Sequence, residues 1–460
     1  MADLAGRDGA HLLRGFMRLS DRNRVEPVVL TSGKGVWVFD ERGTPYLEAV
    51  AGMWCAAFGF GEEELIEAAT RQLRLLPYYH TLTNKSVGPA IELADKIASL
   101  VPVADAKVHL TVSGSEANDF TVKFLRYYNN AVGRPAKKKI IARINGYHGA
   151  TIAATSLTGL ARYHQNFDLP LPGFLHTGDP HYYRNGLAGE TPEEFAARMG
   201  ADLEQLILTE GPETVAGFIA EPCTGGGGVV IPPPTYYDEI QRVLDRYDVA
   251  FVDDEVVTGF GRTGNLFGAE TFGIRPDTMT LGKGLSGSYQ PIAAVVLSGE
   301  IYEGMEAGSD SVGTFAHGTT YSGHPVAAAV ALRALELMEE RDIVGHVRMV
   351  GHRFEERLRA LAEHPLIGDV RCRGLMGAVE FVSDKSTRAG FSPVGSVSAA
   401  VGAAAQRNGL IVRTCSVGDV IAFSPPLIIT EAEIDEVFDR FDRALAEVTP
   451  EVAAGRIGST

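Results

Sequence analysis

Short apolar runs alternate with amphipathic stretches between about residues 62 and 300. The apolar runs have the character of strands buried on both faces of a parallel sheet, and they lie at 107–112, 139–144, 215–220, 249–257 and 290–297. The amphipathic stretches predict helices at 62–74, 89–101, 113–128, 192–208 and 235–246. Residues 160–190 are predicted to be rich in loops. The alternation predicts an α/β fold with a mostly parallel sheet flanked by helices.

The pattern changes near residue 325 to one typical of an α+β domain. Helices are predicted at 325–340, 344–362, 396–408 and 431–447, and strands near 368–382, at 410–413 and at 419–423. Upstream, a helix and loop reach about residue 25, and 35–43 predicts a strand and a turn. We therefore predict an N-terminal segment (1–61) that joins the small domain, a large domain (62–324) and a small C-terminal α+β domain (325–460).

Composition narrows the possible partners and the compartment. The chain of 460 residues has a formal charge of −16 and a pI near 5.3, which argues against nucleic acid or an anionic membrane as a partner. Its four cysteines are far apart and form no metal-binding or disulfide pattern, so we expect reduced thiols and no metal site. We find neither an apolar signal core nor a run long enough to span a bilayer, and we expect a cytoplasmic protein.

Two residues at predicted strand ends indicate a specific chemistry. Asp254 lies in the acidic end of the 249–257 run, and Lys283 follows a second short apolar segment between two glycines. In open α/β sheets, ligands bind outside the carboxyl ends of the strands. A lysine amine can form a Schiff base with an aldehyde, and a carboxylate can keep a pyridine nitrogen protonated. Pyridoxal phosphate needs both of these groups from the protein. Taken alone, a surface lysine and a helix-capping aspartate remain open alternatives.

Three further strand ends carry polar or aromatic residues, which are Ser113, Gly114 and Ser115, then Tyr147 and His148, then Glu221. A Gly/Ser turn that opens a helix offers free N–H groups to a phosphate, although plain helix capping would use the same residues. Tyr147 could stack on a ligand ring or simply pack in a turn. The glycine run at 225–228 is not followed by Lys-Ser/Thr and so is no nucleotide-binding loop. Together, these strand ends favour a cofactor site.

With these segments assembled, the chain resembles the class III (ω-) aminotransferases of the pyridoxal-phosphate type I fold. The likeness runs from about residue 25 to 447, and its motifs lie at 113–118, 145–149, 220–222, 254–264, 282–285 and 317–325. Within the class, Ala51-Gly-Met-Trp-Cys55 and the segment that starts Ser424-Pro-Pro favour the ω-amino acid/amine:pyruvate transaminases.

The resemblance implies a role for each matching residue. Lys283 and Asp254 are the catalytic pair. The cofactor-binding set is Ser113, Gly114, Ser115, Tyr147, His148, Glu221, Asp254, Val256, Lys283 and Thr320, and the substrate-binding set is Trp54, Tyr147 and Arg413. Because the threonine that matches Thr320 serves the neighbouring subunit, the resemblance also implies a homodimer, or a tetramer, with active sites at the subunit interface.

The resemblance further implies a two-step exchange in which an ω-amino acid or primary amine gives its amino group to a keto acid, for which we expect pyruvate. The alternatives are 2-oxoglutarate as acceptor, taurine or a diamine as donor, and an aminomutase or decarboxylase on the same scaffold. A non-catalytic scaffold protein would need Lys283 or Asp254 to be lost, and both are present. The loop at 413–419 is two residues longer than is usual in the class, which leaves the direction of Arg413 open.

Overall fold

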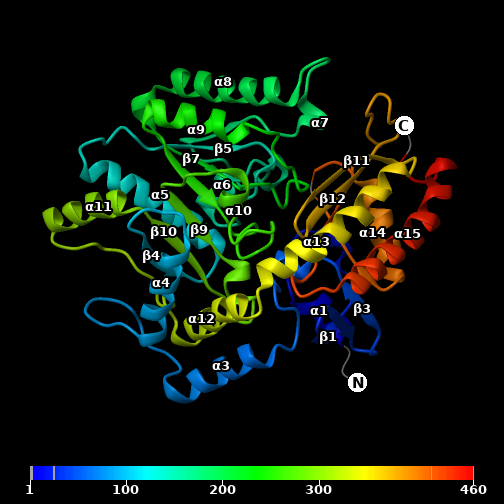
Figure 1. The fold of residues 1–460 in the computed structure, drawn as a ribbon, viewed down its shortest axis with the longest axis horizontal. Helices are drawn as coiled ribbons and strands as arrows, with labels where there is room; N and C mark the ends of the chain where they lie inside the picture. The colour runs from blue at the N-terminus through cyan, green and yellow to red at the C-terminus, as the bar shows by residue number, and fades with distance from the viewer. Residues whose placement is uncertain (1–3, 24–25, 416, 459–460) are drawn as a thin grey trace.

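Two parts of unequal size make up the computed structural model, which describes residues 4–23, 26–415 and 417–458 (Figure 1). Within those residues, the larger part contains a seven-stranded sheet. Its strand order is β4 (Lys107–Thr111), β10 (Ala293–Leu297), β9 (Thr278–Leu281), β8 (Ala250–Asp254), β7 (Val215–Ala220), β5 (Lys139–Arg143) and β6 (Phe174–Thr177). Strand β10 runs antiparallel to both of its neighbours, and the other pairs are parallel. The predicted mostly parallel sheet is confirmed.

Helices cover both faces of this sheet because alternate residues of each strand point to opposite sides. One face packs against α5 (Gly114–Ala131), α6 (Ile152–Leu157) and α11 (Gly299–Val312). Helices α3 (Glu63–Leu75), α4 (Gly88–Leu100), α8 (Pro192–Glu210), α9 (Tyr236–Tyr247) and α12 (Pro325–Glu340) contribute to the core of the other face. In β10, for example, Ala293 and Val295 join the first core, whereas Ala294 and Val296 join the second.

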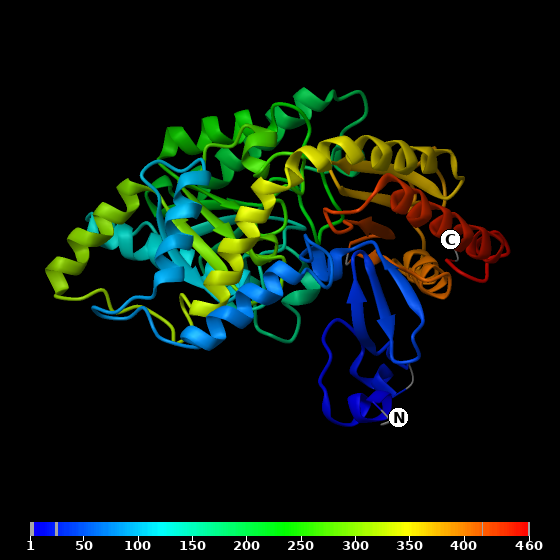
Figure 2. The same ribbon diagram turned by 60° about the horizontal axis from the view of Figure 1, so that its bottom comes forward.

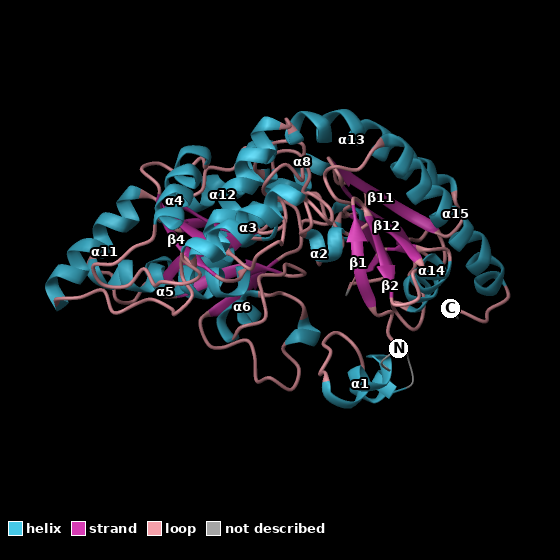
Figure 3. Ribbon diagram, turned by 90° about the horizontal axis from the view of Figure 1, so that it is seen from below, coloured by secondary structure: helices cyan, strands magenta, loops and turns pink. Residues whose placement is uncertain are grey.

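The smaller part has an antiparallel sheet that carries long helices on its outer side (Figure 3). Its strand order is β11 (Ile367–Arg373), β12 (Met376–Phe381), β15 (Val420–Phe423) and β14 (Arg413–Thr414), and its helices are α13 (Ile343–Ala360), α14 (Ser396–Arg407) and α15 (Glu431–Ala453). The remaining short α-helices of the described residues are α1 (Leu4–His11), α2 (Ala51–Trp54), α7 (Tyr182–Asn185) and α10 (Gly268–Phe272).

A third sheet joins the two ends of the chain. It contains β1 (Leu30–Lys34), β2 (Trp37–Asp40), β3 (Pro45–Glu48) and β13 (Leu410–Ile411), and the last two pair in parallel. Figure 2 shows the N-terminal strands beside the C-terminal part. The strand predicted at 410–413 is therefore two strands in different sheets, and the chain changes sheet at Val412.

The domain limits drawn from the sequence stay a prediction. Helix α12, where the pattern changes, contacts α3, α4 and the 3-10 helix Lys283–Ser286, whereas α13 contacts α15 and β11. The described residues contain no helix that is both long and apolar enough to cross a membrane.

The sequence analysis missed α11 because three glycines weaken its helical pattern. Two of them allow a close approach to α5. A Cβ on Gly304 would lie 2.5 Å from the Tyr128 ring, and a Cβ on Gly308 would lie 2.6 Å from Ala131. Strands β1 and β6 were also missed, the latter within the segment that was predicted to be loops.

Candidate active site

A cavity of about 420 Å³ lies at the carboxyl ends of the large sheet. Most of the predicted site residues line it, namely Ser113, Gly114, Ser115, Tyr147, His148, Glu221, Asp254, Val256 and Lys283. Three predicted residues, Trp54, Thr320 and Arg413, are not part of its lining. The parallel strands bring these side chains together because their carboxyl ends share one edge of the sheet.

Asp254 is the last residue of β8 and is buried. Its Oδ2 accepts a hydrogen bond from the amide of Asn118 at 2.9 Å and lies 2.7 Å from His148 Nδ1. Its Oδ1 accepts from the backbone N–H of Val256 at 3.2 Å. Burial alone would raise the pKa of Asp254, but the contacts with His148 and Asn118 lower it overall. The site therefore favours an ionised carboxylate at this strand end.

Lys283 begins the 3-10 helix that follows β9 and adopts a left-handed backbone conformation, with φ of 44°. Its side chain is half-buried and lines the cavity. The surrounding protein lowers the pKa of the Lys283 ammonium by removing it from water, and the charges of Asp254 and Glu221 oppose this effect without cancelling it. A lowered pKa makes the neutral amine, which is the nucleophile and the base, easier to form.

The N-terminus of α5 forms one end of the cavity. Ser113 Oγ accepts a hydrogen bond from the N–H of Glu116, and Glu116 Oε2 accepts one from the N–H of Val112. The first N–H groups of an α-helix have no partner within the helix, and Gly114 and Ser115 are the first two residues of α5. A Cβ on Gly114 would lie 3.0 Å from the Val256 side chain, so glycine keeps this end open. The arrangement suits a phosphate.

Glu221 connects two walls of the cavity. Its Oε1 accepts a hydrogen bond from the backbone N–H of Tyr147 at 3.0 Å, and its Oε2 accepts one from the N–H of Gly225 at 2.8 Å. Burial raises the pKa of the Glu221 carboxyl. The Tyr147 ring lies 5.7 Å from that of Tyr163 in an edge-to-face arrangement. Glu221 thus holds the loop that carries Tyr147 against the glycine run.

The three predicted residues outside the lining occupy different surroundings. Trp54 is 5% exposed and packs in an apolar cluster, while its neighbours Met53 and Cys55 line the cavity. The Arg413 guanidinium lies 5.8 Å from the centre of the Phe16 ring. Thr320 is exposed, and its carbonyl accepts a hydrogen bond from Tyr78. Their roles in substrate and cofactor binding stay predictions.

Several lining residues were missed by the sequence analysis, namely Met53, Cys55, Asn118, Ser286 and Gln290. Asn118 has the clearest signal, since it follows Ser115 by three positions and lies on the same side of α5. Its amide donates both to Asp254 and to the carbonyl of His148. Helical spacing from the predicted phosphate site could have identified it.

These groups fit pyridoxal phosphate. Helix N–H groups offer an anion site, Asp254 offers an ionised partner for a pyridine nitrogen, and Lys283 offers an amine for an aldehyde. Nine of the residues expected to hold the cofactor line one cavity.

Comparison with known proteins identifies the family. The model of the family "Aminotransferase class-III" matches residues 19–445. This chain is a class III aminotransferase. The predicted fold, enzyme class and cofactor are therefore confirmed, because class III aminotransferases share the type I fold and use pyridoxal phosphate.

Relatives of this aminotransferase are known from sequence and from structure. "Gamma aminobutyrate transaminase 1, mitochondrial" from Solanum lycopersicum is 46% identical over 456 residues, which cover 98% of this chain and 88% of the relative. The omega transaminase from Pseudomonas jessenii, solved in complex with PMP, is 47% identical with a TM-score of 0.97 and covers 99% of this chain and 100% of that one. A structure described as "Transaminase with L-ala" is 48% identical with a TM-score of 0.90, covering 92% and 100%.

Proposed function

We propose that this aminotransferase transfers the amino group of an ω-amino acid or a primary amine to pyruvate. The observation that carries the proposal is the common cavity of Lys283 and Asp254, with the N-terminus of α5 at its anion-binding end. The pKa of the lysine and that of the aspartate are both lowered, as proton transfer beside a protonated pyridine ring requires.

Each residue has a definite task in this proposal. Pyridoxal phosphate, when bound, supplies an aldehyde and a ring that accepts electron density. Asp254 keeps a proton on the pyridine nitrogen, and His148 and Asn118 hold its carboxylate in place. Lys283 Nζ removes the proton from the amine-bearing carbon of the donor, and it later delivers one to the corresponding carbon of the acceptor.

The remaining residues bind rather than react. The first N–H groups of α5, at Gly114 and Ser115, hold the phosphate. Tyr147 and Val256 line the cavity and would hold the cofactor ring between them, and Glu221 fixes the loop of Tyr147. The exposed Thr320 would reach the phosphate bound by a second copy of the chain, which makes the working unit at least a homodimer. We place this dimer in the cytoplasm, whereas the plant relatives are named mitochondrial or chloroplastic.

The choice of substrates has support from the names of the relatives. The plant relatives are named for gamma-aminobutyrate. This compound carries its amino group at the end remote from its carboxylate. Several structural relatives are named omega transaminases. L-alanine, present in another, is the amino acid that forms when pyruvate accepts an amino group. Burial raises the pKa of the Tyr147 hydroxyl, and the positive charge of Arg413 opposes this effect, so we place Arg413 where it would bind the carboxylate of the keto acid.

A donor panel tests the proposal. 4-Aminobutyrate, β-alanine, taurine, putrescine and 1-phenylethylamine are each supplied with pyruvate or with 2-oxoglutarate, and alanine, glutamate and carbon dioxide are measured. We expect alanine from pyruvate, with 4-aminobutyrate or 1-phenylethylamine among the good donors. If glutamate forms from 2-oxoglutarate and no alanine forms from pyruvate, pyruvate is rejected as the acceptor. Carbon dioxide release, or product without any acceptor, would reject transamination in favour of a decarboxylase or an aminomutase.

A further inference from the structure

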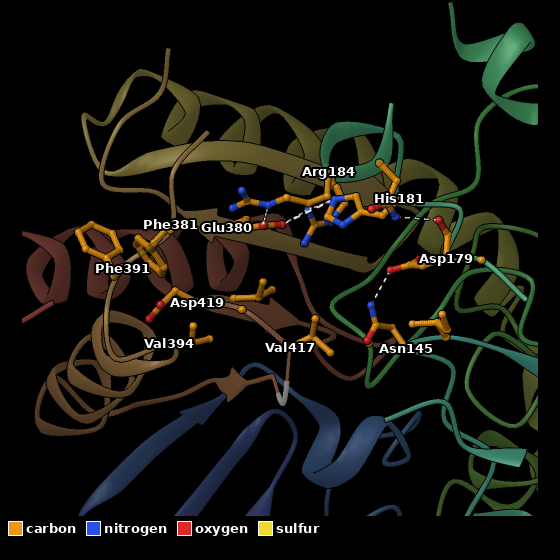
Figure 4. A pocket seen from close by; sticks show the side chains of 18 of the residues that line it. Asn145, Asp179, His181, Arg184, Glu380, Phe381, Phe391, Val394, Val417 and Asp419 are labelled. Atoms are coloured by element: carbon orange, nitrogen blue, oxygen red, sulfur yellow. Dashed lines mark hydrogen bonds and ion pairs between the residues drawn. The ribbon is translucent and has the colours of Figure 1, made fainter. Parts of the chain in front are cut away.

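A second cavity of about 620 Å³ lies between the loops of the large part and the sheet of the smaller part (Figure 4). Charged residues of its lining pair with one another. The guanidinium of Arg371 contacts His181 and Glu380, and Arg184 forms an ion pair with the same glutamate. Because these charges are already paired, they indicate no ligand.

One wall of the catalytic cavity, by contrast, comes from outside the large sheet and its connections. Met53 and Cys55 line the cavity, whereas its other lining residues all lie between Val112 and Ile292. The two residues belong to residues 50–55, called the 50–55 turn below, which include α2 between the helices of the large part and strand β1 (Figure 3). The other lining residues include the groups proposed to hold the cofactor. The 50–55 turn therefore borders the space that is left for a substrate.

The backbone of the 50–55 turn is strained. Ala51 and Trp54 adopt the left-handed conformation, with φ of 49° and 65°, which residues other than glycine rarely adopt. Gly52, between them, has φ of 68°. Strained conformations persist only where the surrounding structure holds them in place. The turn therefore needs firm contacts to keep Met53 and Cys55 in the cavity wall.

Glu48 supplies such contacts from the end of β3. Its Oε1 accepts a hydrogen bond from the N–H of Val50 at 3.2 Å, and its Oε2 accepts one from the N–H of Gly52. The residue is 2% exposed, and its own N–H donates to the carbonyl of Val36, in the turn between β1 and β2, at 2.9 Å. The carboxylate of Glu48 thus connects the N-terminal sheet to the strained turn.

A carboxylate at this position is costly for the fold. Burial raises the pKa of Glu48 to about 7, although the N–H groups of Gly52 and Val50 and the charge of Arg262 act in the opposite direction. A neutral side chain at position 48 would avoid the cost of burying a charge. Buried ionisable groups with a shifted pKa are concentrated at functional sites. The burial of Glu48 therefore favours a role in the active site over a role in stability.

We propose that Glu48 is a positioning residue, which holds the 50–55 turn so that its two lining side chains form a firm wall for the substrate. This inference rests on the proposed function, because the amine and the keto acid would occupy the same space in turn. A loosened wall should weaken the binding of both. Proton transfer itself depends on Lys283 and Asp254, so KM should change more than kcat.

Steady-state kinetics of the holoenzyme with 1-phenylethylamine and pyruvate tests the proposal. Glu48→Gln keeps the size of the side chain but has one acceptor oxygen, and it should raise both KM values by about threefold or more. Glu48→Ala removes both acceptors and should raise them by about tenfold or more. In each variant, kcat should fall by less than about threefold. KM values within about twofold of wild type in either folded variant, or a loss confined to kcat, would overturn the proposal.

Asp40→Asn is the matched control. Asp40 ends β2 and also accepts two backbone N–H groups of a turn, from Arg42 at 2.9 Å and from Thr44 at 2.8 Å. This turn is not part of the cavity lining. Asp40→Asn should therefore leave both KM values within about twofold of wild type. An equal rise in Asp40→Asn and Glu48→Gln would indicate a general effect on the sheet and would also count against the proposal.

Alkylation of Cys55 by iodoacetamide reports on the turn without any turnover. Cys55 is partly exposed, and its Sγ donates to the carbonyl of Ala51 at 3.4 Å. Peptide mass spectrometry of the holoenzyme should show alkylation at least about threefold faster in Glu48→Gln than in wild type, and no change in Asp40→Asn. If wild type does not turn over the substrate pair, the proposed function fails, and the alkylation rate still tests Glu48. Equal rates in Glu48→Gln and wild type would overturn the role of Glu48.

Discussion

His148 Nδ1 lies 2.7 Å from Asp254 Oδ2, and both side chains are buried. Asn118 donates to the same oxygen from α5. The carboxylate that faces the cavity is therefore held from two sides, by a loop residue that follows β5 and by a helix that follows β4. Charge and direction at Asp254 both depend on these neighbours.

Replacing Asp254 with Asn should lower the rate of proton transfer by several powers of ten and leave the fold intact. An amide cannot hold a positive charge on a pyridine nitrogen, so the ring accepts less electron density. Stopped-flow absorbance in single turnovers measures this step. His148→Gln, which removes only one support of the carboxylate, should cost roughly 10–100-fold. An unchanged rate in Asp254→Asn counts against the role proposed for this residue.

Replacing Lys283 with Ala should abolish turnover and the absorbance that the cofactor has when it is bound covalently to this lysine. The variant removes the only atom proposed to take the donor proton. Lys34→Ala, at an exposed position on β1, should behave as wild type. In the wild type, the rate of proton transfer should rise with pH as Lys283 loses its proton, with a midpoint below 10.5 because burial lowers its pKa. Near-normal turnover in Lys283→Ala would reject the assignment.

Replacing Arg413 with Ala should raise the KM for pyruvate by about tenfold or more, since a bidentate contact with the carboxylate is lost. The KM for 1-phenylethylamine, which has no carboxylate, should change much less. Steady-state kinetics with each substrate varied in turn measures both effects. Arg407→Ala, on the exposed side of α14, serves as the control. Equal losses for both substrates mean that another residue binds the carboxylate.

Glu48 should make the stability of the protein depend on pH. Burial raises its pKa from 4.5 to about 7, although its carboxylate accepts the N–H groups of Val50 and Gly52. Because the pKa of Glu48 is higher in the folded state, protonation of Glu48 stabilises the fold. This stabilisation is complete below about pH 4.5 and is lost as the pH rises through about 7. The loss amounts to about 3 kcal/mol of unfolding free energy.

Glu48→Gln removes this titration, so its stability relative to wild type should improve by about that amount between pH 4.5 and 8. Urea unfolding of both proteins at several pH values gives the difference. For Glu92→Gln, at an exposed position, the unfolding free energy should change with pH in the same way as that of the wild type. A constant difference between Glu48→Gln and wild type would show that Glu48 does not titrate in this range.

The sequence predicted the elements that carry the site better than it predicted where individual side chains lie. Asp254 and Lys283 could be located because apolar runs end beside them, and strand ends share one edge of a parallel sheet. Trp54 could not be placed in this way. Its side-chain direction depends on left-handed backbone at Ala51 and Trp54, which a short Gly-rich motif does not reveal.

Contacts between residues that are far apart in sequence could not be predicted from the local pattern either. One apolar run at 410–413 gave no sign that β13 and β14 belong to separate sheets. The glycines of α11 looked unfavourable for a helix until the neighbouring α5 supplied the reason for them. In both cases, a partner distant in sequence decides the local structure.

The pairing of β3 with β13 has a consequence for biosynthesis. Leu410 of β13, which pairs with Leu47 of β3, lies 363 residues further along the chain. At about 5–20 residues per second, a ribosome needs roughly 20–70 s to make that stretch. During this time the free edge of β3 can pair with other nascent chains. Chaperones that bind unfolded chains, and slow expression at low temperature, therefore protect the edge of β3 until β13 covers it.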